Sequence, residues 1–90
     1  MNTIQAPLFG KQKKKLHVNQ INALDKAVSA IVKNPTIGEL KKGDLAGVRV
    51  YKFDMVHQEY LLAYVETKKQ ITLLTIATHE NFYKNLKKTR

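Results

Sequence analysis

The apolar residues of this chain change their spacing near residue 48, and that change decides which folds the sequence can adopt. Between residues 19 and 33 they recur at intervals of three and four, the spacing of one helix face: Ile21, Leu24, Ala27, Val28, Ile31 and Val32. From residue 48 onward, VRVYKF, EYLLAYVET and QITLLTIAT are rich in the β-branched and aromatic residues typical of strands. The chain therefore combines a helical first half with a sheet-forming second half.

The first half predicts two helices. After an extended start at Asn2 to Ala6, Pro7 suits a first helical turn, and LFGKQKKKL is expected to form a short basic helix. HVNQ interrupts it, and a second helix follows until Asn34 and Pro35, because a proline disfavours the helical conformation of the residue before it. The two segments are expected to form a helical hairpin with one apolar face.

The second half predicts an antiparallel meander of three strands, separated by DMVHQ and KKQ. LLAYV and LLTIA are too continuously apolar for a sheet with water on both sides, so we expect the hairpin to pack on one face. Arg49, Tyr51 and other polar strand residues are expected to gather on the opposite face. A short C-terminal helix is expected from His79 through Lys87, which gives an α+β fold in a single domain, residues 1–90.

The charge balance points to a polyanionic partner. Sixteen Lys and Arg oppose seven Asp and Glu, a net charge of +9, and such self-repulsion is tolerated most easily when nucleic acid or an acidic protein binds the surface. The chain has no cysteine, which removes disulfides, thiolate zinc sites and thiol nucleophiles, and a cytoplasmic location is expected. We expect no contact with a membrane, because no apolar segment approaches the roughly 18 residues that a span needs.

The C-terminal segment IATHENFYKNLKKTR concentrates groups that could carry chemistry. An apolar run stops at His79, Glu80 follows, and Phe82 and Tyr83 stand among several cations. Phe82 is expected in the core. No two histidines have the spacing of metal ligands, so we expect neither a metal nor another cofactor.

The order of these segments carries a family resemblance. A short leading strand, a helical hairpin ending in NP, ELKKGDLAGVRVYKF, an apolar strand and a last strand running into THENFY follow one another over nearly the whole chain. This order resembles the RelE/ParE superfamily of bacterial toxin–antitoxin toxins. The resemblance implies a four-stranded antiparallel sheet, an acidic antitoxin partner and, in the RelE, HigB and YafQ-like branches, cleavage of mRNA on the ribosome. DNA would be reached only through an antitoxin complex.

The resemblance also implies site residues. His79 matches the terminal catalytic histidine of the RNase members, Tyr83 the aromatic residue after it, and Arg49 the strand arginine. RNA cleavage without a metal needs a base for the 2′-hydroxyl, cations beside the phosphate and an acid for the 5′-oxygen, and an imidazole can serve either proton role. Arg49 offers a planar fork for phosphate oxygens, and Tyr83 could stack on a base. RNA binding is expected from Lys41, Lys42, Lys52, Lys84 and Lys87.

Each of these residues also has a structural interpretation. His79 could only cap the last helix, Tyr83 could pack inward, and Arg49 could pair with Asp44 or Glu66. The second proton-transfer group stays open, because the loop where YafQ-like members have further histidines and an acid reads KKGD here.

The sequence therefore favours a ribosome-dependent mRNA endonuclease that inhibits translation. One alternative is a ParE-type inhibitor of DNA gyrase. A basic module that binds nucleic acid or ribosomes without chemistry is the other.

Overall fold

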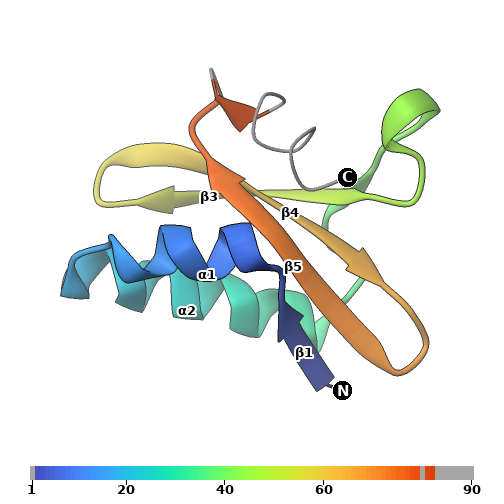
Figure 1. Ribbon diagram of the computed structural model, residues 1–90, viewed down its shortest axis with the longest axis horizontal. Coiled ribbons are helices and arrows are strands. Elements are labelled where there is room, and N and C mark those ends of the chain that lie inside the picture. The colour runs from blue at the N-terminus through green and yellow to red at the C-terminus, as the bar shows by residue number, and fades with distance from the viewer. Residues whose placement is uncertain (1, 80, 83–90) are drawn as a thin grey trace.

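The computed structural model of the chain describes residues 2–79, 81 and 82. Within them lie the helices α1 (Pro7–Lys14) and α2 (Val18–Lys33) and the strands β1 (Asn2–Gln5), β2 (Glu39–Leu40), β3 (Arg49–Met55), β4 (Gln58–Glu66) and β5 (Gln70–Ala77). Figure 1 shows the two helices as one layer against a twisted sheet. The expected α+β class and the helical hairpin on one face are confirmed. The expected C-terminal helix through Lys87 lies outside the described residues, apart from its first few positions.

The helices begin and end where local chemistry predicts. Pro7 opens α1, and the N–H of His17 donates to Gln20 Oε1 at 2.9 Å, one half of the capping box that starts α2. Helix α2 ends at Lys33, before Asn34 and Pro35, as expected. None of the helices among the described residues has the length and apolar character that crossing a lipid bilayer requires.

The sheet contains the expected meander and two further strands. Its order is β1-β5-β4-β3-β2, and β3, β4 and β5 pair in antiparallel fashion. The resemblance implied four antiparallel strands, whereas the described part of the sheet has five and β1 runs parallel to β5. A parallel pair needs a long crossover, and here both helices and three strands separate its members in sequence.

Both faces of the sheet are apolar. The face toward the helices, called the helix face here, carries Leu62, Tyr64, Leu73 and Ile76 in one core with Phe9. The opposite face, called the second face, has its own core of Val48, Val50, Leu61, Ala63, Leu74, Ala77 and Phe82. Phe82 is fully buried there, as the sequence predicted. Strand β4 is therefore buried on both sides, which explains its unbroken apolar run.

One expectation about the faces is wrong. Tyr51 was expected on the face away from the helices, but it packs against the helix-face core and its ring is parallel to that of Phe53, with centroids 6.4 Å apart. Side chains alternate along a strand, so Val50, which belongs to the second-face core, sends its neighbours Arg49 and Tyr51 to the helix face.

Tyr64 and Arg49 lock the connection from α2 to β2 onto the sheet. Tyr64 Oη donates to the Pro35 carbonyl at 2.7 Å and accepts from the Gly38 N–H at 3.0 Å. Arg49 donates from Nε to Glu66 Oε1 at 2.7 Å and from Nη1 to the Gly38 carbonyl at 2.9 Å. A Cβ atom on Gly38 would lie only 2.8 Å from Tyr64 Oη, so a larger residue would break this arrangement.

The turn between β3 and β4 is strained. Val56 and His57 have φ angles of 51° and 65°, the left-handed region that two-residue hairpin turns of type I′ require at both central positions. Asn-Gly suits these angles, whereas a β-branched valine is strongly disfavoured there. The hairpin therefore keeps its register at an energetic cost.

Replacing the strained pair by Val56→Asn and His57→Gly should stabilise the fold by about 1–2 kcal/mol, because these residues tolerate the left-handed conformation. Urea unfolding followed by circular dichroism measures the change. Val56→Ile is the matched control: it keeps a β-branched side chain at the same backbone angles and should change stability little. Equal stability of the double variant and the wild type would show that the turn is not strained.

The Tyr64 hydroxyl should make stability depend on alkaline pH. Burial raises the pKa of the Tyr64 phenol above its usual 10.0, so the folded chain holds the phenolic proton more tightly than the unfolded chain. Its contribution is full below about pH 10 and is lost as the pH rises through the folded pKa. Tyr64→Phe should cost about 1–3 kcal/mol at neutral pH by leaving Pro35 and Gly38 without their partner.

The measurement is urea unfolding of wild type and Tyr64→Phe at neutral pH and above pH 10. The gap between the two should narrow at high pH, since the other titrating groups are common to both. A gap that stays constant or widens would contradict this role of the phenol.

Candidate functional site

A groove of about 400 Å³ lies on the second face at the edge of the sheet. Its lining comes from the connection after α2, from β2 and the residue after it, and from β3, β4 and the residue two beyond β5: Ile37, Glu39, Lys41, Val50, Tyr51, Lys52, Leu61 and His79. Tyr51 borders the groove from its place between Val50 and Lys52 on β3, while its ring packs against the helix-face core. The groove thus gathers one imidazole and two of the lysines that the sequence predicted for RNA binding. An apolar floor carries these polar groups.

Strand register explains why distant residues meet in this groove. Lys52 on β3 pairs with Leu61 on β4, and Leu61 pairs with Ala77 on β5. His79 follows Ala77 by two residues and therefore reaches the same face. Lys41 directly follows β2, where its N–H donates to the Val48 carbonyl at 2.9 Å. Its Nζ lies 3.5 Å from Glu39 Oε1, and because the Glu39 side chain is exposed this ion pair is weak.

His79 is exposed at the end of β5. The turn that follows is closed by Thr78, whose carbonyl accepts from the Asn81 N–H at 3.1 Å. Among residues 2–79, 81 and 82, no hydrogen bond engages the His79 side chain. The imidazole is thus available to a ligand in the groove.

Glu59 is a candidate that sequence reasoning missed. It lines a hollow of about 310 Å³ together with Gln58, Thr78 and His79. The pairing of Leu61 with Ala77, continued by two residues, also puts Glu59 opposite His79. The two-residue turn at Val56 and His57 fixes Glu59 only against β3, whereas its position opposite His79 follows from the register of β4 with β5, which no local sequence pattern signals.

The remaining predicted residues do not join the groove. Arg49 lies on the helix face and is held by Glu66, one of the two acids proposed as its partner; its side chain is only 16% exposed. The side chain of Asp44, the other proposed partner, lies outside the described part. Lys42 is exposed at the start of the 3-10 helix Gly43–Leu45, away from the groove lining. Tyr83, Lys84 and Lys87 also lie outside the described residues.

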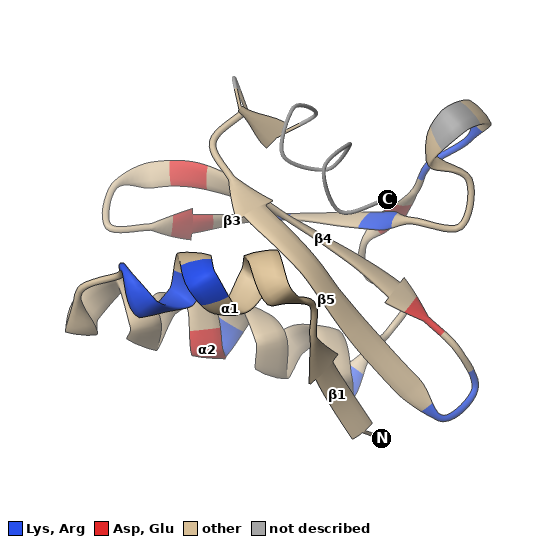
Figure 2. Cartoon of the chain, viewed as in Figure 1, with Lys and Arg blue, Asp and Glu red and all other residues tan. Residues whose placement is uncertain are grey.

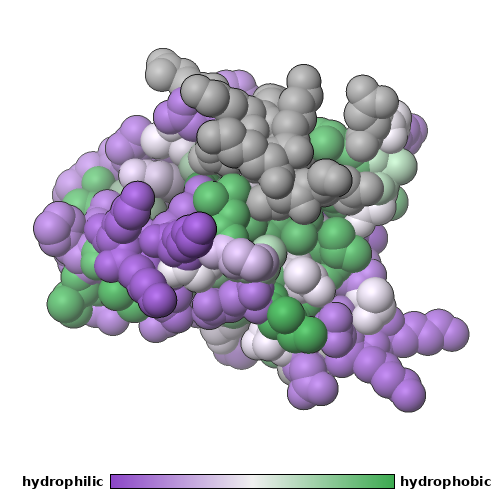
Figure 3. Space-filling view, viewed as in Figure 1, coloured by the Kyte–Doolittle hydropathy of each residue, from purple (hydrophilic) through white to green (hydrophobic). Residues whose placement is uncertain are grey.

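Positive charge is spread over several sides of the molecule. Figure 2 shows Lys and Arg on α1 and in the connection from β4 to β5, and acidic residues on the hairpin of β3 and β4. In Figure 3 hydrophilic side chains gather over the helical layer and at that connection. One of the α1 lysines, Lys13, is neutralised in part by Asp25, with Nζ 3.6 Å from Oδ1. A polyanion would therefore be attracted broadly, and the groove differs from this background by its imidazole.

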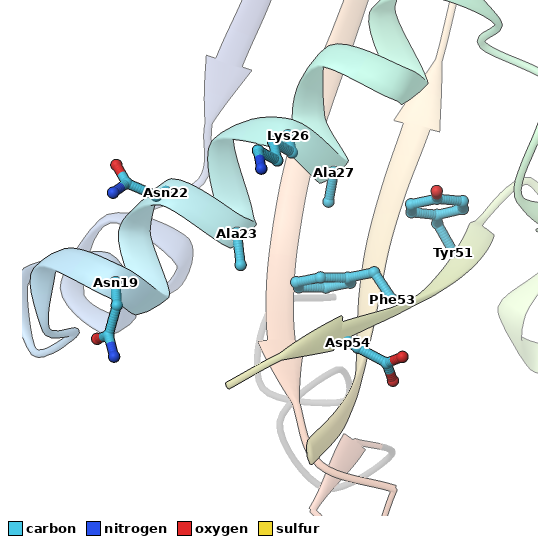
Figure 4. Close-up of a pocket in the computed structure, with 8 residues that line it drawn as sticks. All are labelled: Asn19, Asn22, Ala23, Lys26, Ala27, Tyr51, Phe53 and Asp54. Atoms are coloured by element: carbon cyan, nitrogen blue, oxygen red, sulfur yellow. The ribbon is translucent and has the colours of Figure 1, made fainter. Parts of the chain in front are cut away.

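A second hollow of about 380 Å³ lies between α2 and β3. Figure 4 shows Ala23 and Ala27 directed toward the Phe53 ring, with Tyr51 beside it and Asp54 pointing away from the helix. Lys26 is the one cation in its lining, and no histidine lines it. This hollow suits packing better than proton transfer.

The described residues contain no group of three or more His, Asp or Glu side chains that could hold a metal ion. Proton transfer and electrostatic stabilisation are the chemistry that the groove side chains themselves can supply. Its imidazole and the carboxylate of Glu59 can exchange protons, and its two ammonium groups can stabilise negative charge.

Comparisons with known proteins agree with this architecture. The free state of a double mutant of the E. coli toxin RelE superposes with a TM-score of 0.71 at 15% sequence identity, covering 99% of this chain and 97% of that one. The intact E. coli RelBE toxin–antitoxin complex contains a chain that matches with a TM-score of 0.68 at 16% identity, covering 86% and 94%. A search of curated protein sequences found no match.

The family model described as "ParE-like toxin of type II bacterial toxin-antitoxin system" matches residues 3–87. This match confirms the superfamily that the sequence indicated. The chain belongs to the ParE-like toxins of type II bacterial toxin–antitoxin systems.

Proposed function

We propose that this toxin is a metal-independent endoribonuclease that cleaves mRNA on the ribosome and so inhibits translation. The observation that carries the proposal is the groove in which His79 meets Lys41 and Lys52. A toxin that acts by binding alone has no need of a titratable group in the same groove as two cations. The similarity to RelE supports the fold, whereas the proposed activity rests on the chemistry of the groove side chains.

The reaction needs one proton removed and one supplied. The 2′-oxygen attacks the adjacent phosphorus and loses its proton to a base, while the bond from phosphorus to the 5′-oxygen breaks and that oxygen takes a proton from an acid. The products are a 2′,3′-cyclic phosphate and a 5′-hydroxyl. We assign the acid to His79 and the base to Glu59, which lie together where β4 begins and β5 ends.

The lysines would act on the phosphate. Lys41 directly follows β2 and Lys52 lies on β3, across the groove from His79. Their ammonium groups would stabilise the charge that builds on the non-bridging oxygens. Tyr83 would stack on a base next to the cleaved bond, and Lys84 and Lys87 would add contacts to the RNA backbone.

We infer that Arg49 serves the site indirectly. Its guanidinium is engaged by Glu66 and by the Gly38 carbonyl, and it could reach a phosphate only by leaving both. Held as it is, Arg49 fixes the connection that carries Ile37 and Glu39 to the wall of the groove. Loss of Arg49 would then lower activity mainly by destabilising the fold.

An acidic antitoxin is the partner that the charge favours. The toxin carries a net charge of +9, and one of its structural neighbours comes from a toxin–antitoxin complex. We expect the antitoxin to cover the groove and block access to His79. A cytoplasmic location follows from the proposed targets, the ribosome and its mRNA.

Inhibition of DNA gyrase is the second candidate function. It is favoured by the family model that matches the chain, which describes ParE-like toxins. In that case the groove would bind a protein surface, and its imidazole would have no role in proton transfer.

Substitution of His79 tests the proposal. His79→Ala should fold, since the side chain is exposed, and should lower mRNA cleavage on translating ribosomes by roughly 10²-fold or more, the usual worth of a positioned acid or base. Tyr83→Ala should cost less, about 1–3 kcal/mol if the ring only stacks on a base. Toeprinting measures the cleavage, and circular dichroism checks the fold.

His57→Asn is the matched control, because His57 is also exposed and lies at the hairpin tip outside the groove, and asparagine tolerates the left-handed backbone of that turn. It should cleave like the wild type. Full cleavage by folded His79→Ala would remove the imidazole from the chemistry. Absence of cleavage by the wild type, together with inhibition of DNA supercoiling by gyrase, would favour the second candidate.

A further inference from the structure

Strand β5 contains an extra residue that changes which face its side chains reach. Leu73 pairs with Tyr64, but Thr75 pairs with Ala63, so Leu74 has no partner of its own in the register with β4. Before this bulge, Ile71 and Leu73 belong to the helix-face core; after it, Ile76 does. An unbroken strand would have put Thr75 there instead.

The apolar pattern of β5 does not choose between these two registers. In the bulged register the helix face receives Ile76, and Leu74 and Ala77 go to the second face. In an unbroken register Thr75 and Ala77 would face the helices, and Leu74 and Ile76 would face away. Both arrangements bury apolar groups on both faces, so hydrophobic burial alone leaves the register weakly specified.

The site depends on this choice. In the bulged register Ala77 lies opposite Leu61, and His79, two residues on, lines the groove with Leu61 and Lys52. A shift by one residue would bring Ile76 opposite Leu61 and move Thr78 to the position that His79 occupies. The imidazole would then point to the helix face of the sheet, away from the groove.

One side chain from α1 binds the bulge directly. Gln12 Oε1 accepts from the Ile76 N–H at 2.9 Å and from the Thr75 hydroxyl at 3.2 Å, the two residues that follow Leu74. Thr75 is fully buried, and β1 pairs with β5 only as far as Leu73, so Gln12 takes over the strand edge where β1 ends. Without this acceptor a buried hydroxyl and a backbone N–H would lose their partner, and these bonds form in the bulged register.

We propose that Gln12 is a positioning residue of the groove: by holding β5 in its bulged register, it places His79, rather than Thr78, beside Glu59. Gln12 stands 63 residues before Thr75 in the chain and acts only through β5. Its effect on register is independent of what the toxin cleaves. Its effect on activity rests on the proposed function.

Register can be measured directly by NMR on the full chain. Cross-strand NOEs should connect Leu61 with Ala77 in the wild type. In Gln12→Leu, which keeps the side-chain size but removes the acceptor, a second set connecting Leu61 with Ile76 should appear. Gln5→Leu, the same change at an exposed position of β1, should leave the wild-type NOEs alone.

Two further variants separate this role from a general loss of folding. Thr75→Val keeps the shape of the side chain, removes one of the two bonds and should populate the shifted register partially. Gln12→Glu keeps an acceptor oxygen and should restore the wild-type NOEs. A well-folded Gln12→Leu or Thr75→Val that shows only the contact of Leu61 with Ala77 would overturn the proposal.

An mRNA cleavage assay measures the effect of Gln12 on activity. Gln12→Leu should lower kcat by about tenfold or more with little change in KM, because the lysines that bind RNA stay in place while the imidazole moves. Gln12→Glu should recover most of the loss. If the wild type cleaves no mRNA, the proposed function fails while the NMR result still decides the role of Gln12. A shifted register with unchanged kcat would show that Gln12 does not position the site.

Discussion

Burial of β4 on both faces is the constraint on which the rest of the structure depends. Leu62 and Tyr64 pack toward the helices, while Leu61 and Ala63 pack into the second core. The centre of the sheet therefore has no room for a polar site. Functional groups can stand only at strand ends, on β3 and on the connections, and this is where the groove collects Lys41, Lys52 and His79.

In a sheet with two apolar faces, hydrophobic burial specifies the register only weakly, because a slip by one residue exchanges one buried side chain for another at little cost. Polar side chains supply the missing specificity. Tyr64 and Arg49 fix the connection before β2, and Gln12 holds the bulge of β5. The strained turn at Val56 and His57 fixes β3 against β4 in the same way. These few polar contacts and the strained turn set the geometry of the groove.

The sequence predicted the features that depend on local pattern: α2 ending before Pro35, three strands in antiparallel order, and the burial of Phe82. It missed features set by how the strands come together. The face of Tyr51 depends on which side of β3 the helices cover, the pairing of β1 on its place beside β5, and the position of Glu59 on the register of β4 with β5. Periodicity within one segment carries no information about these relations. His79 and Lys52 were named from chemistry, and only the fold shows that they share a groove.

Lysine labelling on stalled ribosomes tests the location of the RNA most directly. The toxin is bound to ribosomes carrying an mRNA with 2′-O-methyl groups, which lack the attacking hydroxyl, and is then treated with an amine-reactive reagent and analysed by mass spectrometry. We expect Lys41 and Lys52 to be protected while Lys26 and Lys33 on α2 stay as reactive as in the free protein. Protection of the α2 lysines with Lys41 and Lys52 left reactive would contradict the assignment of the groove as the site of RNA binding.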